Sequence, residues 1–184
     1  MTKTIFLMLI SSVIFLSACA TLSPQECHTA NWKQIGEKDG QSGLSSRIAN
    51  HYKACSKVNV VPNQNLYEEG YKQGQKQYCQ PRNIYKLALN GSGSYRVCPV
   101  EQHSELRPFY DVPHQFYQAE VNKNNLDREL NRHQDYLLDK DLSKEKRDQY
   151  IKKIQQLKID KKRIENEYDD AEWKLTQFKR RHYL

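Results

Sequence analysis

The sequence feature that most constrains the fold is the absence of glycine and proline from residue 114 to the end of the chain. These two residues commonly end helices, so a long stretch without them favours long helices. Apolar and aromatic side chains recur in this stretch at alternating steps of three and four, which is the spacing of a heptad seam. The seam comprises Phe116, Ala119, Leu126, Leu130, Leu137, Tyr150, Ile154, Leu157, Ile164, Tyr168, Ala171, Leu175 and Phe178, and it is interrupted by Lys123, His133, Lys161 and His182.

A polar segment, residues 139–143, divides this seam into two parts. Two seamed helices that are joined by a short polar turn fold back on each other. We therefore predict an antiparallel coiled-coil helical hairpin over residues 114–184, with residues 101–113 as the connector that precedes it. The alternative is one uninterrupted rod that pairs with another molecule.

Residues 1–18 have the features of a secretory signal peptide. Lys3 precedes an apolar run, and small residues follow this run. Such a segment is cut off in the mature protein, and its apolar run is too short to span a bilayer as a permanent helix. The end of the segment, Leu16 to Cys19, reads Leu-Ser-Ala-Cys and resembles the lipobox of bacterial lipoproteins. The alternative is an ordinary signal peptide with a cysteine at its cut site.

The resemblance to a lipobox implies that Cys19 is lipidated and becomes the first residue of the mature chain. Residues 19–26 would then be a tether, and the protein would attach to a membrane through its lipid anchor. Asp after the lipidated cysteine resembles an inner-membrane retention signal, and this chain has Ala20 there. We therefore expect the protein in the cell envelope, at the outer membrane and facing the periplasm.

Four cysteines remain after Cys19, and an even number in an oxidising compartment favours two disulfides. Three connectivities exist, and we favour Cys27–Cys55 and Cys79–Cys98 because each closes a short local unit. The alternative is a metal site made of Cys27, His28, His51 and Cys55. Structural zinc sites commonly use a Cys-x-x-Cys pair, which the sequence does not contain, so neither a metal nor another cofactor is expected.

Two segments repeat the same pattern, a Gly-x-x-x-Gly-Gln motif after an aromatic residue. The glycines are Gly36 and Gly40 in the first segment and Gly70 and Gly74 in the second. Glycine costs about 1 kcal/mol relative to alanine inside a helix, so its repeated use favours a role in close backbone approach. We predict two short helices that cross at these four glycines.

Between residues 84 and 98, the pair Asn90-Gly91 separates two short runs that contain aromatic and β-branched residues. Asn-Gly in this context is a turn signal of a β-hairpin. We predict a short irregular hairpin here, clasped by Cys79 and Cys98. The predicted fold class is thus mainly α: a small disulfide-stapled helical head with this hairpin, residues 27–100, followed by the coiled-coil helical hairpin.

The cysteines, glycines and aromatic residues of the head also form an ordered series. It resembles a family of small bacterial lipoproteins that is defined by a domain of unknown function, number 2799, over about residues 27–100. The series comprises Trp32, Gly36, Asp39, Gly40, Gly43, His51, Cys55, Tyr67, Gly70, Gly74, Tyr78, Cys79, Gly91, Tyr95, Val97, Cys98 and Pro99. The chain departs from the family at residues 87–89, where a glycine is expected. The resemblance implies an envelope lipoprotein with a compact, glycine-packed head, and it implies no activity, cofactor or catalytic residue.

Charge and motifs limit the functions that the chain can have. The formal net charge is +7, and neither half of the mature chain is a basic block. Nucleic acid is not an expected partner, because the signal peptide directs the protein out of the cytoplasm. Neither Gly-x-Ser-x-Gly nor His-Glu-x-x-His occurs in the sequence. His51 and Asp39 are a candidate base and orienting carboxylate, but the sequence places no nucleophile beside them.

Three functional hypotheses remain. In the first, the protein is a non-enzymatic lipid-anchored scaffold whose residues 114–184 contact an envelope protein or the cell wall, or pair with a second copy of the chain. In the second, it is a binding module for envelope glycan or lipid. The stacking surface would be Tyr52, Tyr67, Tyr71, Tyr78, Tyr85 and Tyr95. In the third, it is a hydrolase that uses His51.

Overall fold

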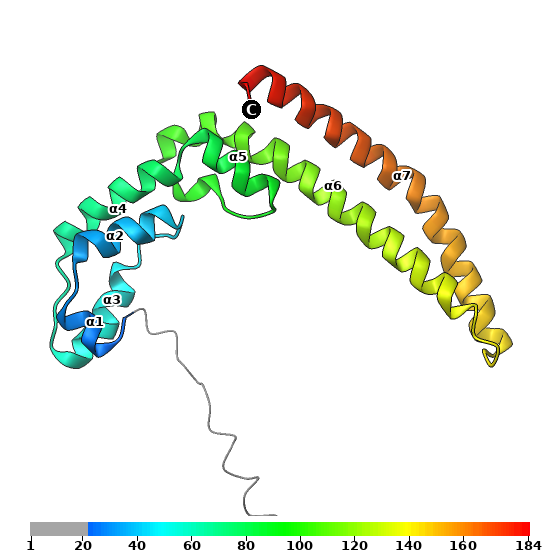
Figure 1. Ribbon diagram of the computed structural model, residues 1–184, viewed down its shortest axis with the longest axis horizontal. Coiled ribbons are helices and arrows are strands. Elements are labelled where there is room, and N and C mark those ends of the chain that lie inside the picture. Colours follow the sequence, from blue (N-terminus) through cyan, green and yellow to red (C-terminus); the bar gives the residue numbers. More distant parts are fainter. Residues whose placement is uncertain (1–21) are drawn as a thin grey trace, which may run out of the picture. The chain divides into compact units, whose positions relative to one another are not determined.

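A computed structural model describes residues 22–184, and all regular structure in this range is helical (Figure 1). The prediction of a mainly helical protein is therefore confirmed. The chain divides into two compact units, one up to Gly74 and one from Gln75 onward. The predicted signal peptide and Cys19 lie outside the described residues. No helix in residues 22–184 is long and apolar enough to cross a membrane.

The first unit contains three short helices and most of a fourth. They are α1 (Pro24–His28), α2 (Trp32–Gln41), α3 (Ile48–Cys55) with the 3-10 turn η1 (Ser56–Val58), and α4 (Gln64–Tyr78). Polar side chains start three of these helices by accepting hydrogen bonds from backbone N–H groups: Ser23 at α1, Asn31 at α2 and Asn63 at α4. The predicted tether is therefore helical from Pro24 onward.

α2 and α4 approach each other backbone to backbone at the predicted glycine positions (Figure 1). A Cβ atom added there would lie 2.0 Å from the Tyr67 carbonyl oxygen at Gly36, 1.8 Å from that of Lys33 at Gly70, and 2.0 Å from that of Glu37 at Gly74. Gly40 is also buried in α2. Only glycine allows the two helices to lie this close.

The second unit contains the end of α4, three shorter elements that follow it, and then two long helices. They are α5 (Pro81–Leu89), the 3-10 turns η2 (Tyr95–Val97) and η3 (Val100–Gln102), α6 (His103–Tyr136) and α7 (Lys144–His182). One core cluster gathers around the second pair of cysteines and includes Tyr78, Ile84, Tyr95 and Leu106.

The predicted irregular hairpin is wrong, because the first of its two runs lies in α5 and the second forms the turn η2. Pro81 occupies the first turn of α5, and Ile84, Tyr85 and Ala88 form its buried face. The helix ends at the Asn-Gly pair, where Gly91 has a φ of 69° and its N–H bonds the Ala88 carbonyl. A positive φ serves a helix C-terminus as well as a hairpin turn, so the pair alone does not distinguish them.

The expected connector, residues 101–113, is helical as well. α6 begins at His103, so Pro108 and Pro113 lie inside it. Proline lacks the N–H of a helical bond and usually kinks or ends a helix. The helix continues through both prolines because tertiary packing holds this segment. Leu106 contacts the core around Ile84, and Pro113 is fully buried.

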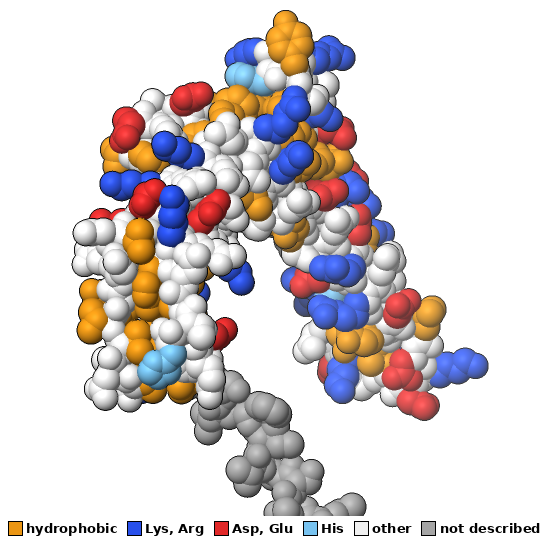
Figure 2. Space-filling model, turned by 60° about the vertical axis from the view of Figure 1, so that its left-hand side comes forward, with side chains coloured by type: hydrophobic (Ala, Val, Ile, Leu, Met, Phe, Trp, Pro, Cys, Tyr) orange, Lys and Arg blue, Asp and Glu red, His pale blue; other side chains and the backbone are white. Residues whose placement is uncertain are grey.

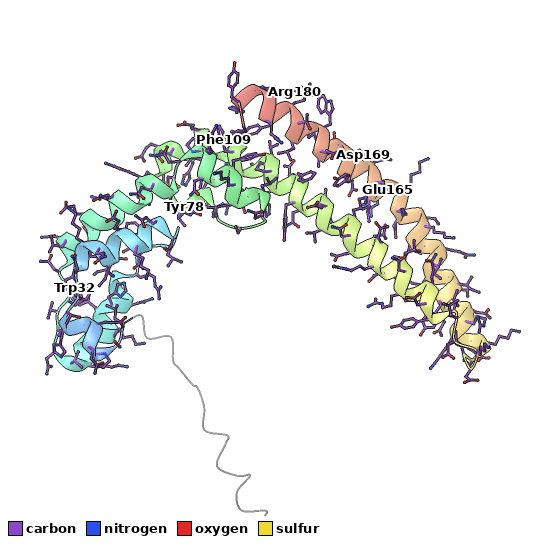
Figure 3. The ribbon with its side chains drawn as sticks, viewed as in Figure 1. Trp32, Tyr78, Phe109, Glu165, Asp169 and Arg180 are labelled. Atoms are coloured by element: carbon purple, nitrogen blue, oxygen red, sulfur yellow. A yellow bond between two sulfur atoms is a disulfide. The ribbon has the colours of Figure 1, made fainter. Side chains whose placement is uncertain are left out.

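α6 and α7 lie side by side and run in opposite directions, and residues 137–143 join them (Figure 1). Near this turn, Leu126 and Leu130 pack against Ile154 and Leu157. At the other end, Phe109, labelled in Figure 3, contacts the ring of Phe178 at a centroid distance of 5.1 Å. We call the pair α6 and α7 the arm.

The polar residues that interrupt the apolar seam have partners within the arm. Lys161 Nζ of α7 lies 3.1 Å from Asp127 Oδ1 of α6, and the hydrogen bond to Asp127 raises the pKa of Lys161. Lys123 lies 3.7 Å from the same carboxylate. The rings of His182 and Phe178 are 4.2 Å apart. These contacts accommodate the polar residues at the helix–helix boundary.

Candidate functional site

The structure brings the predicted base and its orienting carboxylate together. His51 Nε2 lies 2.9 Å from Asp39 Oδ2, so α3 and α2 are joined by this bond. The hydroxyl of Tyr67, on α4, donates to the same oxygen at 2.9 Å. The backbone N–H of Arg47 in turn donates to the Tyr67 hydroxyl at 2.9 Å. A buried cluster of His51, Asp39 and Tyr67 therefore ties three helices of the first unit together.

The cluster is largely buried, although His51 and Asp39 reach the wall of a cleft. The His51 and Asp39 side chains are 3% and 12% exposed, and Tyr67 is fully buried. Burial raises the pKa of Tyr67 to about 12, and its hydrogen bond to Asp39 acts in the same direction. Tyr67 therefore stays protonated near neutral pH and keeps donating to Asp39. This role of Tyr67 is not visible in the sequence, because its partner is 28 residues away and no local pattern marks the contact.

As a catalytic arrangement the cluster is incomplete. The carboxylate accepts from both neighbours, so it can orient the imidazole, as a catalytic orienter does. However, His51 Nδ1 is buried without a hydrogen-bond partner among the described residues. The Tyr67 hydroxyl points to Asp39 rather than to the imidazole. The geometry suits a polar contact that fixes helix packing.

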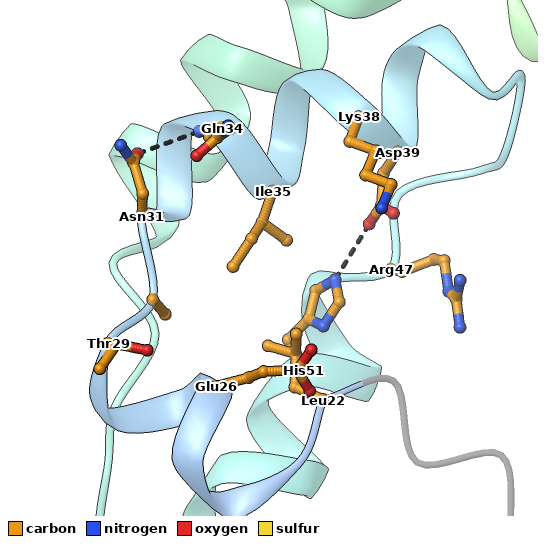
Figure 4. A pocket seen from close by; sticks show the side chains of 11 residues that line it. Leu22, Glu26, Thr29, Asn31, Gln34, Ile35, Lys38, Asp39, Arg47 and His51 are labelled. Carbon is orange, nitrogen blue, oxygen red and sulfur yellow. Dashed lines mark hydrogen bonds and ion pairs between the residues drawn. The ribbon is translucent and has the colours of Figure 1, made fainter.

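A cleft of about 430 Å³ lies beside this cluster in the first unit (Figure 4). Lys38 and Arg47 contribute cations to its lining, and Glu26 contributes an anion. Part of its polar lining is already bonded within the protein. Glu26 accepts from the Ser23 N–H at 2.7 Å, and Asn31 caps α2. The cleft therefore combines mixed charge with apolar wall residues such as Ile35.

The cysteines form two disulfides, Cys27–Cys55 and Cys79–Cys98. The first lies in the core cluster of Trp32 and Tyr67 and joins α1 to α3. Both cysteines of the alternative metal site are thus oxidised. No group of three His, Cys, Asp or Glu side chains in residues 22–184 has the arrangement of a metal site.

The predicted tyrosine surface is mostly interior. Tyr67, Tyr78, Tyr85 and Tyr95 are all buried and belong to hydrophobic cores of the two units. Tyr52 is 36% exposed, and its hydroxyl donates to the Pro62 carbonyl. A ring face that is buried in a core cannot stack on a ligand.

The arm carries exposed apolar side chains among many charges. Figure 2 shows Lys and Arg interspersed with Asp and Glu along it. Leu138, in the turn between the two helices, is 78% exposed, and Tyr136 beside it is 44% exposed. On α7, Ile159 and Trp173 are 70% and 62% exposed. The sequence analysis did not identify these residues, because they lie outside the seam that it followed.

Residues 31–114 match the model of the family described as Protein of unknown function (DUF2799). The resemblance stated from the sequence is therefore confirmed for this segment. The DUF2799 segment runs from the cap of α2 into α6 and includes the His51 cluster, and its description assigns no activity. No curated protein and no solved structure matches the chain significantly.

Proposed function

We propose that the protein is a non-enzymatic, lipid-anchored lipoprotein of the cell envelope that acts as a scaffold or interaction protein through the arm. The exposed apolar turn of the arm is the observation that supports this proposal. Leu138 is 78% exposed and is followed by the charged residues Asp139 and Lys140. Large exposed apolar residues with a polar rim are typical of protein interaction sites. The proposed partner is an envelope protein rather than the cell wall, because glycan offers little apolar surface.

The arm is suited to hold such a turn in place. We interpret it as an antiparallel coiled coil, since the buried residues of α7 form two groups with steps of three and four that are separated by fourteen residues, which is two heptads. These residues are Ile154, Leu157, Ala171, Leu175 and Phe178. At 1.5 Å per residue, a helix with the bounds of α7 is roughly 58 Å long. A stiff helical pair of this length can present its end to a partner at a distance from its base.

The anchor completes the proposal. Lipidation at Cys19 would leave few residues before α1, which begins at Pro24. An extended chain covers about 3.5 Å per residue, so α1 would begin within roughly 18 Å of the lipidated residue. The first unit would then fold next to the membrane. Cys19→Ser is expected to move the protein from the membrane fraction to the soluble fraction.

The arm is tested by photo-crosslinking in intact cells. A photoreactive residue at position 138 is expected to capture a protein partner. Position 100 is the matched control, because Val100 is also 78% exposed but lies in the turn η3. Leu138→Ser is expected to abolish the physiological role, whereas Val100→Ser is expected to leave it intact. Equal crosslinking from both positions, or full function of Leu138→Ser, would contradict the proposal.

A second candidate function is the binding of a small envelope saccharide or lipid headgroup. The cleft with Lys38 and Arg47 is the observation that favours it. Titration calorimetry of the purified protein with envelope saccharides is the test, and Lys38→Ala should weaken any binding that uses the cleft.

The hydrolase hypothesis keeps the His51–Asp39 bond as its support. The hydrolase hypothesis requires that the His51→Ala variant lose hydrolase activity while the circular dichroism spectrum of the variant matches that of the wild type.

A further inference from the structure

The side of α7 that faces away from α6 carries a symmetrical arrangement of side chains. We call it the outer face and define it by Gln156, Ile159, Arg163, Asn166, Asp170 and Trp173, which are all exposed. These residues recur at steps of three and four, so they lie on one stripe of the helix. The buried residues Leu157 and Leu175, which face the interior, belong to the opposite stripe.

Asn166 is the centre of this arrangement. Ile159 precedes it by seven residues and Trp173 follows it by seven, so one large apolar side chain lies two helical turns away on each side. Arg163 precedes Asn166 by three residues, and Asp170 follows it by four. Charges of opposite sign thus flank the centre at nearly equal distances. A surface of this kind is complementary to a copy of itself that runs in the opposite direction.

We propose that two copies of the chain pair antiparallel through the outer face of α7, with a two-fold axis at Asn166. In this register the Ile159 side chain of one copy faces Trp173 of the other, and the symmetry repeats this contact. Arg163 lies beside Asp170 of the other copy, and the two Asn166 amides meet at the axis. A single polar amide in an apolar stripe is a recognised means of fixing helix register.

A groove on the outer face has the position that this pairing requires. It is lined by Ile159, Lys162, Arg163, Asn166, Glu167 and Asp170. The proposed register places the indole of Trp173 from the other copy over the end of this groove at Ile159. Aromatic side chains that enter such surface grooves commonly dominate the affinity of an interface.

Charge supports a second copy as the occupant. The part of α7 before Asn166 is basic, with Lys158, Lys161, Lys162 and Arg163, and the part after it is acidic. The acidic part is residues 167–172, with Glu167, Asp169, Asp170 and Glu172, and Asp169 is labelled in Figure 3. Glu165 is one acidic residue within the basic part. Antiparallel pairing brings each basic part to the acidic part of the other copy, whereas parallel pairing opposes like charges. Further out, Lys152 and Arg180 would face each other, which limits the contact to about residues 156–176.

The ion pairs that exist within α7 on this face do not prevent Arg163 from pairing with Asp170 of the other copy. Arg163 pairs with Glu167 at 2.6 Å, and Asp170 pairs with Lys174 at 2.5 Å. Both are exposed pairs one helical turn apart, and such pairs contribute little to stability because water screens them. The inference rests on the proposed function in one respect: a shared membrane anchor raises the effective concentration of a second copy, so a small contact suffices.

The register is tested by cysteine self-crosslinking of the full chain in the cell envelope. Asn166→Cys is expected to give a disulfide-linked dimer, because the two copies of this residue meet at the axis. Thr176→Cys is the matched control, since it is exposed and lies ten residues from the axis. Its two copies would be roughly 30 Å apart. A disulfide needs Cα atoms within about 7 Å. Co-expression of Ile159→Cys with Trp173→Cys is expected to link the two chains, because these positions face each other in the proposed register.

The chemistry is tested by charge reversal and truncation. Trp173→Ala should weaken association roughly tenfold in sedimentation of the detergent-solubilised protein, as truncation of an interface aromatic does. Leu138→Ala, which removes another exposed apolar side chain, should not. Arg163→Glu should weaken association, and its combination with Asp170→Arg should restore it.

Each outcome separates this inference from the proposed function. Crosslinking of Thr176→Cys as strong as that of Asn166→Cys would mean parallel pairing and would overturn the inference. Failure of both Asn166→Cys and the co-expressed pair Ile159→Cys and Trp173→Cys to crosslink would overturn it as well. In both cases a partner captured from position 138 would leave the proposed function in place. Conversely, self-crosslinking at Asn166 together with an unreactive position 138 would support the pairing and contradict the function of the turn.

Discussion

Replacement of Gly70 by alanine tests the close crossing of α2 and α4. The added Cβ would lie 1.8 Å from the Lys33 carbonyl oxygen, which is a backbone atom and cannot rotate away. Relief to an ordinary contact near 3.5 Å requires the helices to separate by roughly 1.5 Å. Overpacking of this kind costs about 1–3 kcal/mol, and the greater helix propensity of alanine returns about 1 kcal/mol. We expect the upper part of that range, and thus a net loss of about 2 kcal/mol in the free energy of unfolding.

The measurement is urea unfolding of the oxidised protein, followed by far-ultraviolet circular dichroism. Lys72→Ala is the matched control, because Lys72 is an exposed residue of the same helix and its truncation should change stability by less than about 0.5 kcal/mol. The sign of the change in stability distinguishes the close crossing from helix propensity alone. Helix propensity alone predicts that Gly70→Ala is stabilising, so a rise in the urea midpoint would refute the close crossing.

Three further changes probe the disulfide, the buried cluster and the base of the arm. Replacing Cys27 and Cys55 together by serine opens a loop of 28 residues and should lower the free energy of unfolding by about 3–4 kcal/mol, measured by urea unfolding. Tyr67→Phe leaves Asp39 with one donor fewer and should cost about 1–3 kcal/mol at pH 7. Because the folded-state pKa of Tyr67 is raised to about 12 from 10.0, the tyrosine should add stability below pH 10 that is lost as the pH rises towards 12. The stability difference between the wild type and Tyr67→Phe should therefore shrink over this range, and a constant difference would contradict the burial of Tyr67. Phe178→Ala should cost about 3–5 kcal/mol, because the ring is buried against Tyr85 and Leu175. Thermal unfolding that is unchanged in this variant would show that the end of α7 does not pack there.

Long-range features of the first unit were only partly predictable. The cysteine pairing and the glycine positions follow from spacing, since short loops and paired motifs leave few arrangements. The cluster of His51, Asp39 and Tyr67 could be anticipated only for its first two members. Tyr67 enters it because the crossing of α2 and α4 directs its hydroxyl to Asp39, and no local pattern specifies that direction.

The second unit shows how tertiary packing overrides local signals. Asn90-Gly91 was interpreted as a hairpin turn, and it ends a helix instead. Residues 101–113 are expected from the sequence to be a connector, and α6 instead begins at His103 and passes through Pro108 and Pro113. In each case the short-range signal allows two structures, and burial of Ile84, Leu106 and Pro113 selects the helical one.

The sequence by itself determined the helical class, the two long helices beyond residue 114 and the glycines of the crossing, and it favoured the observed pairing of the cysteines among three possible ones. Each of these depends on residues within one helical turn or on a small number of combinations. Only the tertiary structure decided the helical form of residues 81–113, the buried cluster of His51, Asp39 and Tyr67, and the outer face of α7. These depend on which faces of distant helices meet, and the free energy of that contact is set by side chains far apart in the chain.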